Sequence, residues 1–200
     1  MLVKPKNYEE IEVKEFTEFE EIKLGGHACI IKAAEEYIGS TGNKSLRIQV
    51  DIDKTDKQAG FYEKQYNSSK TLPLKWSNCA TKYYSLKESD QCASMLKGLI
   101  TAIEKSNANF IFDWENPNHL ESLVNKKIAG VFGMEQYAKQ DGTVTTINKL
   151  TQIRSLDKLD EIQIPKVKKM DGSYVDLEVF LKEKDFLIID DIEDCNDLPF

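Results

Sequence analysis

Aromatic and cationic side chains alternate through the middle of the chain. Flat rings stack on bases and cations neutralise phosphates, so this combination suits a protein that holds a single-stranded polynucleotide without reading its sequence. The candidates for this chemistry are Arg47, Tyr62, Lys64, Tyr66, Lys75, Trp76, Lys82, Tyr83, Lys139, Lys149 and Arg154. Each has a simpler interpretation as well, because aromatic rings also pack in cores and lysines also solvate surfaces.

Three carboxylates offer a second chemistry. Asp51 and Asp53 alternate along one expected strand, and Glu63 follows on the next with Lys64 beside it. Carboxylate oxygens suit Mg²⁺, so a metal-dependent nuclease is the enzymatic alternative. The Asp-x-Asp spacing is also common on solvated strands, and no complete nuclease motif accompanies it. We therefore do not expect an enzyme.

Other chemistries lack their motifs. The four cysteines, Cys29, Cys79, Cys92 and Cys195, include no C-x-x-C and have no nearby histidine pair, so neither a zinc site nor a disulfide framework is indicated. A G-x-x-x-x-G-K nucleotide loop and a G-x-S-x-G elbow are also missing, which argues against an ATPase or a hydrolase. We expect no cofactor and no metal.

The charge is unevenly distributed. The chain of 200 residues carries a net charge of −7, which at first argues against a nucleic-acid partner. Residues 171–200, however, hold ten acidic residues against two lysines, and residues 22–170 carry a net charge of about +5. A mildly basic body followed by an acidic tail is consistent with a polyanionic ligand.

Length and hydropathy predict a cytoplasmic protein that consists of one domain and a tail. About two-fifths of the residues are hydrophobic, enough for a core. No apolar run approaches the roughly 20 residues that span a bilayer, and the N-terminal residues are too acidic for a signal peptide. We therefore expect a cytoplasmic protein with no membrane partner.

Three strands are predicted in the first third of the body. Residues 27–37 form an apolar run before the turn-rich segment 39–44. Residues 46–53 alternate strictly, with Leu46, Ile48, Val50 and Ile52 on one face. Residues 61–66 are expected to form the third strand, followed by a long polar and aromatic connection over 67–87.

A helix and a hairpin complete the predicted body. Ser89 is a good N-cap, and an apolar stripe from Cys92 to Ile103 predicts a helix that ends at Ser106-Asn107. Residues 126–139 read as a strand with a bend or bulge at Gly130 and Gly133. Gln140-Asp141-Gly142-Thr143 predicts a hairpin turn, and 145–156 return as the fifth strand.

This order predicts a mainly β protein with one main helix. Three strands, a helix and a two-stranded hairpin follow the connectivity β1-β2-β3-α-β4-β5 of the OB-fold, a five-stranded barrel that binds oligonucleotides. A generic α+β sandwich has the same element order. We divide the chain into an N-terminal acidic segment over 1–24, a DNA-binding domain over 25–165, and a linker with a flexible acidic protein-interaction tail over 166–200.

The last residues resemble the tip of bacterial single-stranded DNA-binding proteins, which end in several acids, an apolar residue and Pro-Phe. The matching residues here are Asp190, Asp191, Glu193, Asp194, Asp197, Leu198, Pro199 and Phe200. In that family the tip docks on replication, recombination and repair proteins. The resemblance implies that Phe200 supplies an aromatic anchor and a terminal carboxylate, while the acids face a basic rim. Cys195 and Asn196 interrupt the acidic run.

The body resembles, less closely, the compact single-stranded DNA-binding proteins of bacteriophages. The resemblance rests on Gly25–Ile31, Gly98–Asn107 and the predicted hairpin over 128–156. It implies a phage-encoded protein that protects single-stranded DNA in the host cytoplasm and recruits partner proteins. The alternative is an OB-like adaptor or inhibitor that captures host replication proteins without binding DNA. The residues leave the oligomeric state open, with a homo-oligomer as one alternative.

Overall fold

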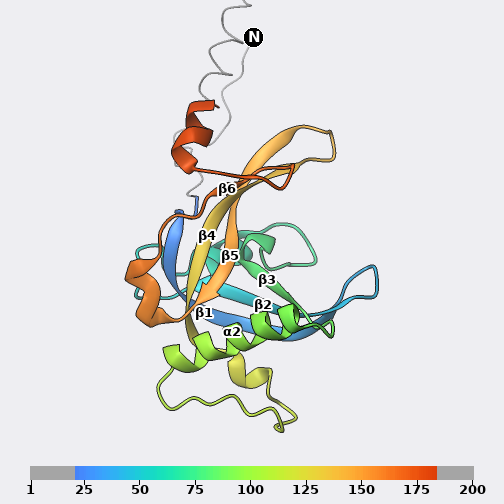
Figure 1. The fold of residues 1–200 in the computed structure, drawn as a ribbon, viewed down its shortest axis with the longest axis vertical. Helices are drawn as coiled ribbons and strands as arrows, with labels where there is room; N and C mark the ends of the chain where they lie inside the picture. The colour runs from blue at the N-terminus through green and yellow to red at the C-terminus, as the bar shows by residue number, and fades with distance from the viewer. Residues whose placement is uncertain (1–20, 184–200) are drawn as a thin grey trace, which may run out of the picture.

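The fold is a mixed, open sheet of seven strands with a few helices, seen in a computed structural model that describes residues 21–183 (Figure 1). The hydrogen-bonded order is β3-β2-β1-β4-β6-β7, and β5 pairs with β4 off this path. The strands are β1 (Gly25–Ile38), β2 (Lys44–Ile52), β3 (Thr81–Ser85), β4 (Lys127–Ala138), β5 (Val144–Arg154), β6 (Val167–Lys168) and β7 (Tyr174–Val175). Within residues 21–183, the β4–β6 pairing is parallel and the other pairings are antiparallel.

The helices are α1 (Phe61–Ser68), α2 (Asp90–Ser106) and the short 3₁₀ helices η1 (Asn78–Ala80), η2 (Glu121–Leu123) and η3 (Leu156–Glu161). In Figure 1 the β1–β2 hairpin and the β4–β5 hairpin both extend past the rest of the sheet on the right of the view. β3 lies between them and approaches β5 as well as its partner β2.

The first two predicted strands are confirmed. Leu46, Ile48, Val50 and Ile52 are all buried, as their alternation predicts. Strand β1 is central, because it pairs antiparallel with β2 along one edge and with β4 along the other. Gly42, at φ 77°, supplies the left-handed residue that the turn between β1 and β2 requires.

The third predicted strand is wrong. Residues 61–66 lie in the helix α1, and the third strand is β3, inside the segment expected to be a connection. A strand would point Phe61 and Tyr62 to opposite faces, whereas both are buried in the core. The carboxylate of Asp51 accepts a hydrogen bond from the Tyr62 backbone at 2.9 Å, which satisfies an N–H that a helix start leaves without a partner.

Helix α2 begins and ends where the sequence predicts. The Ser89 hydroxyl accepts a hydrogen bond from the Cys92 backbone at 3.2 Å, and Asn107 ends the helix. The Asn107 side chain donates to the carbonyls of Ile103 and Lys127, which ties the helix end to the start of β4. Only the second half of the predicted stripe is buried, and Met95 is 47% exposed.

The predicted β4–β5 hairpin is confirmed. Its register shifts between Val131 and Phe132, within the predicted bend. Gly130 is tightly enclosed, because a Cβ there would lie 2.7 Å from the Cys29 sulfur. The buried core, which includes Ile31, Ile48 and Phe132, lies under these strands and under α1 and α2.

The chain after β5 adds to the sheet. For residues 166–200 the sequence predicts a linker and tail, yet β6 pairs with β4 and β7 pairs with β6. Residues 177–183 are helical, and Phe180 is buried. The predicted N-terminal acidic segment falls almost wholly, and the predicted tip falls wholly, outside the described residues.

Candidate nucleic-acid interface

Arg47 and Tyr83 meet on the outer face of the sheet. Arg47 on β2 pairs in register with Tyr83 on β3 and with Glu35 on β1. Its Nη2 donates to a Glu35 carboxylate oxygen at 2.7 Å and its Nε to the same oxygen at 3.1 Å. This hydrogen bonding raises the pKa of Arg47. The guanidinium is therefore held in one orientation on an open sheet surface.

Tyr37 completes this cluster, and the sequence prediction missed it. The centre of the Tyr37 ring lies 5.4 Å from the centre of the Tyr83 ring and 4.8 Å from the Arg47 guanidinium. Tyr37 is 36% exposed and Tyr83 41%. One signal for Tyr37 was present in the sequence, because it follows Glu35 by two residues and therefore shares its face of a strand.

Lys82 and Lys149 lie at a second location, a groove of about 510 Å³ where β3 approaches β5. Lys149 on β5 forms an ion pair with Glu135 on β4 at 2.8 Å. Lys168 on β6 forms a second ion pair with Glu135 at 2.7 Å. Burial, and next the ammonium of Lys149, lower the pKa of Lys82. The groove therefore gathers three ammonium groups around one carboxylate.

The predicted residues of 62–76 divide into core and surface. Tyr62 is 2% exposed and packs against Phe132, so its prediction as a DNA contact is wrong. A ring in the core cannot reach a ligand. Its hydroxyl has no hydrogen-bond partner among the described residues. Tyr66 packs on Trp76 with ring centres 5.6 Å apart.

Trp76 is anchored rather than free. Its ring N–H donates to the Val50 carbonyl at 3.1 Å, so one ring edge is held against β2. Lys64 on α1 and Lys75 before η1 are exposed. These residues lie on the connection between β2 and β3. Among the residues that the structure describes, no hydrogen bond, ion pair or ring contact joins them to the Tyr37–Arg47–Tyr83 cluster.

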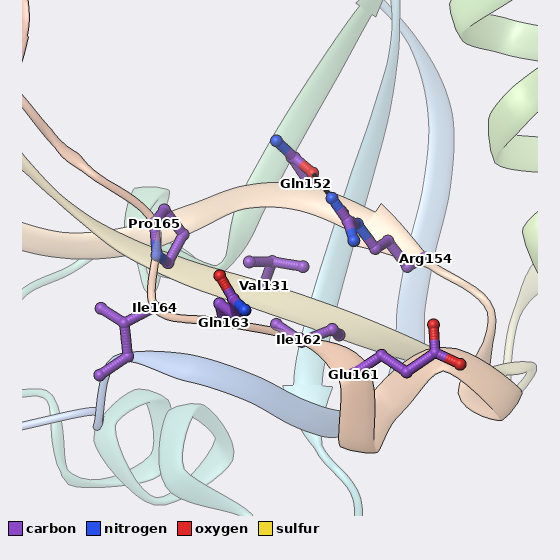
Figure 2. Close-up of a pocket in the computed structure, with 8 residues that line it drawn as sticks. All are labelled: Val131, Gln152, Arg154, Glu161, Ile162, Gln163, Ile164 and Pro165. Atoms are coloured by element: carbon purple, nitrogen blue, oxygen red, sulfur yellow. Dashed lines mark hydrogen bonds between the residues drawn. The ribbon is translucent and has the colours of Figure 1, made fainter.

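Lys139 lies apart from both clusters, whereas Arg154 lines a hollow that adjoins the lysine groove. Lys139 is exposed at the turn of the β4–β5 hairpin. Arg154 lies beside a second hollow, of about 290 Å³, between the end of β5 and residues 161–165 (Figure 2). Its Nε and Nη2 donate to the Gln152 side-chain oxygen at 3.2 and 3.0 Å. Figure 2 shows Val131 between these two sides.

Asp51, Asp53 and Glu63, the three carboxylates that suggested a nuclease, each contact different partners. Asp51 is buried and accepts from two backbone N–H groups. Asp53 accepts from Thr55 and forms an ion pair with Lys127, while Glu63 forms one with Lys32. Within the range 21–183, no group of three or more His, Cys, Asp or Glu residues is arranged to hold a metal ion. Asp51 and Asp53 thus brace the start of α1 and the loop before it.

Comparison with known proteins finds no matching family and no matching curated sequence. In the part of the chain that the structure describes, no helix combines the length and apolar character needed to cross a membrane. The Tyr37–Arg47–Tyr83 cluster and the lysine groove are therefore the features of the fold that bear on function.

Proposed function

We propose that the chain binds single-stranded DNA on the outer face of β1, β2 and β3 and in the adjoining lysine groove. The single observation that carries this proposal is the exposed cluster of Tyr37, Arg47 and Tyr83. Two accessible rings in contact with each other, with a fixed guanidinium over the Tyr37 ring, form a platform on which bases would stack irrespective of their identity.

The lysine groove supplies the phosphate contacts. Lys82 and Lys149 lie where β3 approaches β5, and β3 also carries Tyr83. Successive residues of a strand point to opposite faces, so Lys82 lies on the other face of β3 from Tyr83. A DNA strand that stacks on the platform would reach these cations by crossing β3, which ends the strand order of the sheet, and they would neutralise its backbone there. Each contact between a cation and a phosphate releases counterions, so we expect binding that weakens as salt is added, although Glu35 and Glu135 partly offset these cations.

The element order supports the same proposal at the level of the fold. Strands β1, β2 and β3, helix α2 and the hairpin β4–β5 follow each other as in an OB-fold, and β3 approaches β5 as closure into a barrel would require. On this proposal the added strands β6 and β7 are an extension of the barrel. The chain would act by binding and not as an enzyme.

The acidic tip belongs to the proposal through its sequence. Residues 190–200 would recruit proteins of DNA replication, recombination or repair, with Phe200 as the anchor. Such a protein would coat and protect single strands in the cytoplasm while other enzymes are brought to them.

A titration of fluorescein-labelled oligo(dT), followed by anisotropy across a salt series, tests the proposal. Wild-type protein should bind, and the logarithm of the affinity should fall linearly with the logarithm of salt. Tyr83→Ala should weaken binding about 5- to 100-fold, because one stacked base contributes about 1–3 kcal/mol. Lys97→Ala, on the exposed face of α2, is the matched control.

Two outcomes would overturn the proposal. One is no binding by the wild-type chain in low salt, which would favour the adaptor alternative. The other is cleavage of the oligonucleotide during incubation with Mg²⁺, which would favour the nuclease.

A further inference from the structure

The two hollows beside β5 adjoin each other. The hollow at Lys82 and the hollow at Arg154 share two lining residues, Gln152 and Pro165. Residues 161–168 line both on one side, and β5 lines both on the other. Figure 2 shows Arg154 and Pro165 at opposite ends of the second hollow. The groove therefore runs along β5 instead of ending at the lysines.

A bulge in β5 turns its cations to the same side. Val131 pairs with Gln152 and Phe132 pairs with Leu150, so Thr151 is an extra residue in the strand. Leu150 is buried, and regular alternation would bury Gln152 as well. The extra residue places Lys149, Gln152 and Arg154 on one face. This face is about 13 Å long, because the partners of Lys149 and Arg154 on β4 are four residues apart at roughly 3.3 Å per residue.

Gly133 lies at the floor of the groove, where there is little room for a side chain. A Cβ at this position would lie 3.0 Å from the Thr151 methyl and 3.2 Å from the Pro165 ring. Residues 163–168 can therefore lie close over β4, where Glu135 and Lys168 are register partners. The wall opposite β5 is thus made by the segment after Pro165, for which the sequence predicts a linker.

This wall adds positive charge and a ring. Lys168 binds Glu135, and Lys166 faces Asp176 at 3.2 Å. Tyr174 on β7 is the register partner of Lys168 and is 65% exposed. Five cations from three segments of the chain line the groove, together with two carboxylates. Glu135 bridges two of the cations, and Glu161 forms an ion pair with Lys158.

We propose that this groove binds the sugar-phosphate backbone of the single strand. On this proposal, residues 161–176 form one side of the DNA-binding site and contact the DNA. Glu135 occupies the place of a phosphate and holds Lys149 and Lys168 in position until the strand arrives. The inference rests on the proposed function, which it deepens by adding the path of the backbone.

The lowered pKa of Lys82 agrees with an anion site. Its ammonium is disfavoured by burial and next by Lys149. A phosphate between the two lysines would relieve that repulsion and favour the charged form of Lys82.

The experiment uses the full chain and the oligo(dT) titration across salt. Lys168→Ala and Arg154→Ala should each weaken binding about fivefold at 0.1 M salt and reduce the salt slope by about 0.7 to 1. Glu135→Gln should tighten binding and keep the slope, because it removes a competing negative charge without removing a cation. Lys97→Ala again serves as the control, and thermal melting verifies that each variant is folded.

The two proposals fail differently. If wild-type protein does not bind oligo(dT), both the proposed function and the assignment of the groove as a DNA site are wrong. If wild-type protein binds and Tyr83→Ala weakens it, while Lys168→Ala and Arg154→Ala bind as wild type, only the groove is wrong. Weaker binding by Glu135→Gln in a folded protein would also contradict the role given to Glu135.

Discussion

The guanidinium of Arg47 lies 4.8 Å from the centre of the Tyr37 ring while two of its nitrogens donate to Glu35. Two contacts on the neighbouring strand β1 thus hold the arginine, one with the carboxylate of Glu35 and one with the ring of Tyr37. A cation held in this way loses little side-chain freedom when a base or a phosphate reaches it.

Replacing Arg47 with lysine tests the planar contact separately from the charge. Lysine keeps the positive charge but loses the fork that binds Glu35 and the flat face above Tyr37. We expect Arg47→Lys to weaken oligo(dT) binding about three- to tenfold with an unchanged salt slope, whereas Arg47→Ala should also lower the slope by about 0.7. Equal slopes for the two variants would contradict a phosphate contact by Arg47.

The buried thiol and phenols predict that the fold weakens in alkali. Burial raises the pKa of Cys29 above the ordinary 9.0, and the pKa of Tyr62 and of Tyr84 above the ordinary 10.0. Above pH 9 the unfolded chain releases protons that the folded chain retains, so the free energy of unfolding falls as pH rises. Urea unfolding between pH 7 and 10.5 measures this dependence, and a flat profile would contradict it.

Tyr62→Phe should make the protein more stable, or leave its stability unchanged. The Tyr62 hydroxyl is buried without a hydrogen-bond partner among the described residues, and such a group costs about 1–3 kcal/mol. Removing it also removes one of the groups that titrate in alkali, so the pH profile of unfolding should become shallower. A loss of more than about 1 kcal/mol in urea unfolding at pH 7 would show that the hydroxyl does have a partner.

Gly130 and Gly98 form a matched pair for alanine substitution. A Cβ at Gly130 would lie 2.7 Å from the Cys29 sulfur and 3.2 Å from Leu150, so Gly130→Ala should destabilise the fold by about 1–3 kcal/mol. A Cβ at Gly98 in α2 meets nothing within 4 Å, so Gly98→Ala should stabilise it by about 0.5–1 kcal/mol. Thermal melting of both variants checks the opposite signs.

Removing residues 190–200 should leave DNA binding intact or strengthen it. These residues hold five acids, which on the proposed function would compete with a polyanion for the basic groove. The effect should be largest at low salt, because added ions screen the attraction between tail and groove. The truncated chain should also lose its capture of replication and repair proteins in a pull-down with the full-length chain as control. Complete loss of DNA binding on truncation would show that the tail is part of the DNA site.

Local patterns in the sequence determined the regular elements. The alternation from Leu46 to Ile52 predicted a strand, Ser89 predicted the start of α2, and Asp141-Gly142 predicted the hairpin turn. Each of these signals lies within a few residues, where backbone geometry and capping decide the outcome. The same patterns were insufficient at 61–66, because the hydrogen bond from Tyr62 to Asp51 that supports a helix there depends on a residue eleven positions earlier.

Tertiary structure alone decided which side chains share a surface. Register places Tyr83 and Arg47 opposite each other and brings Tyr37 to them, and the fold of the chain buries Tyr62 instead. The groove depends further on one extra residue in β5 and on a return of the chain over Gly133. A sequence records the types of these residues, but strand pairing between distant segments determines their distances, and those distances decide what the site can bind.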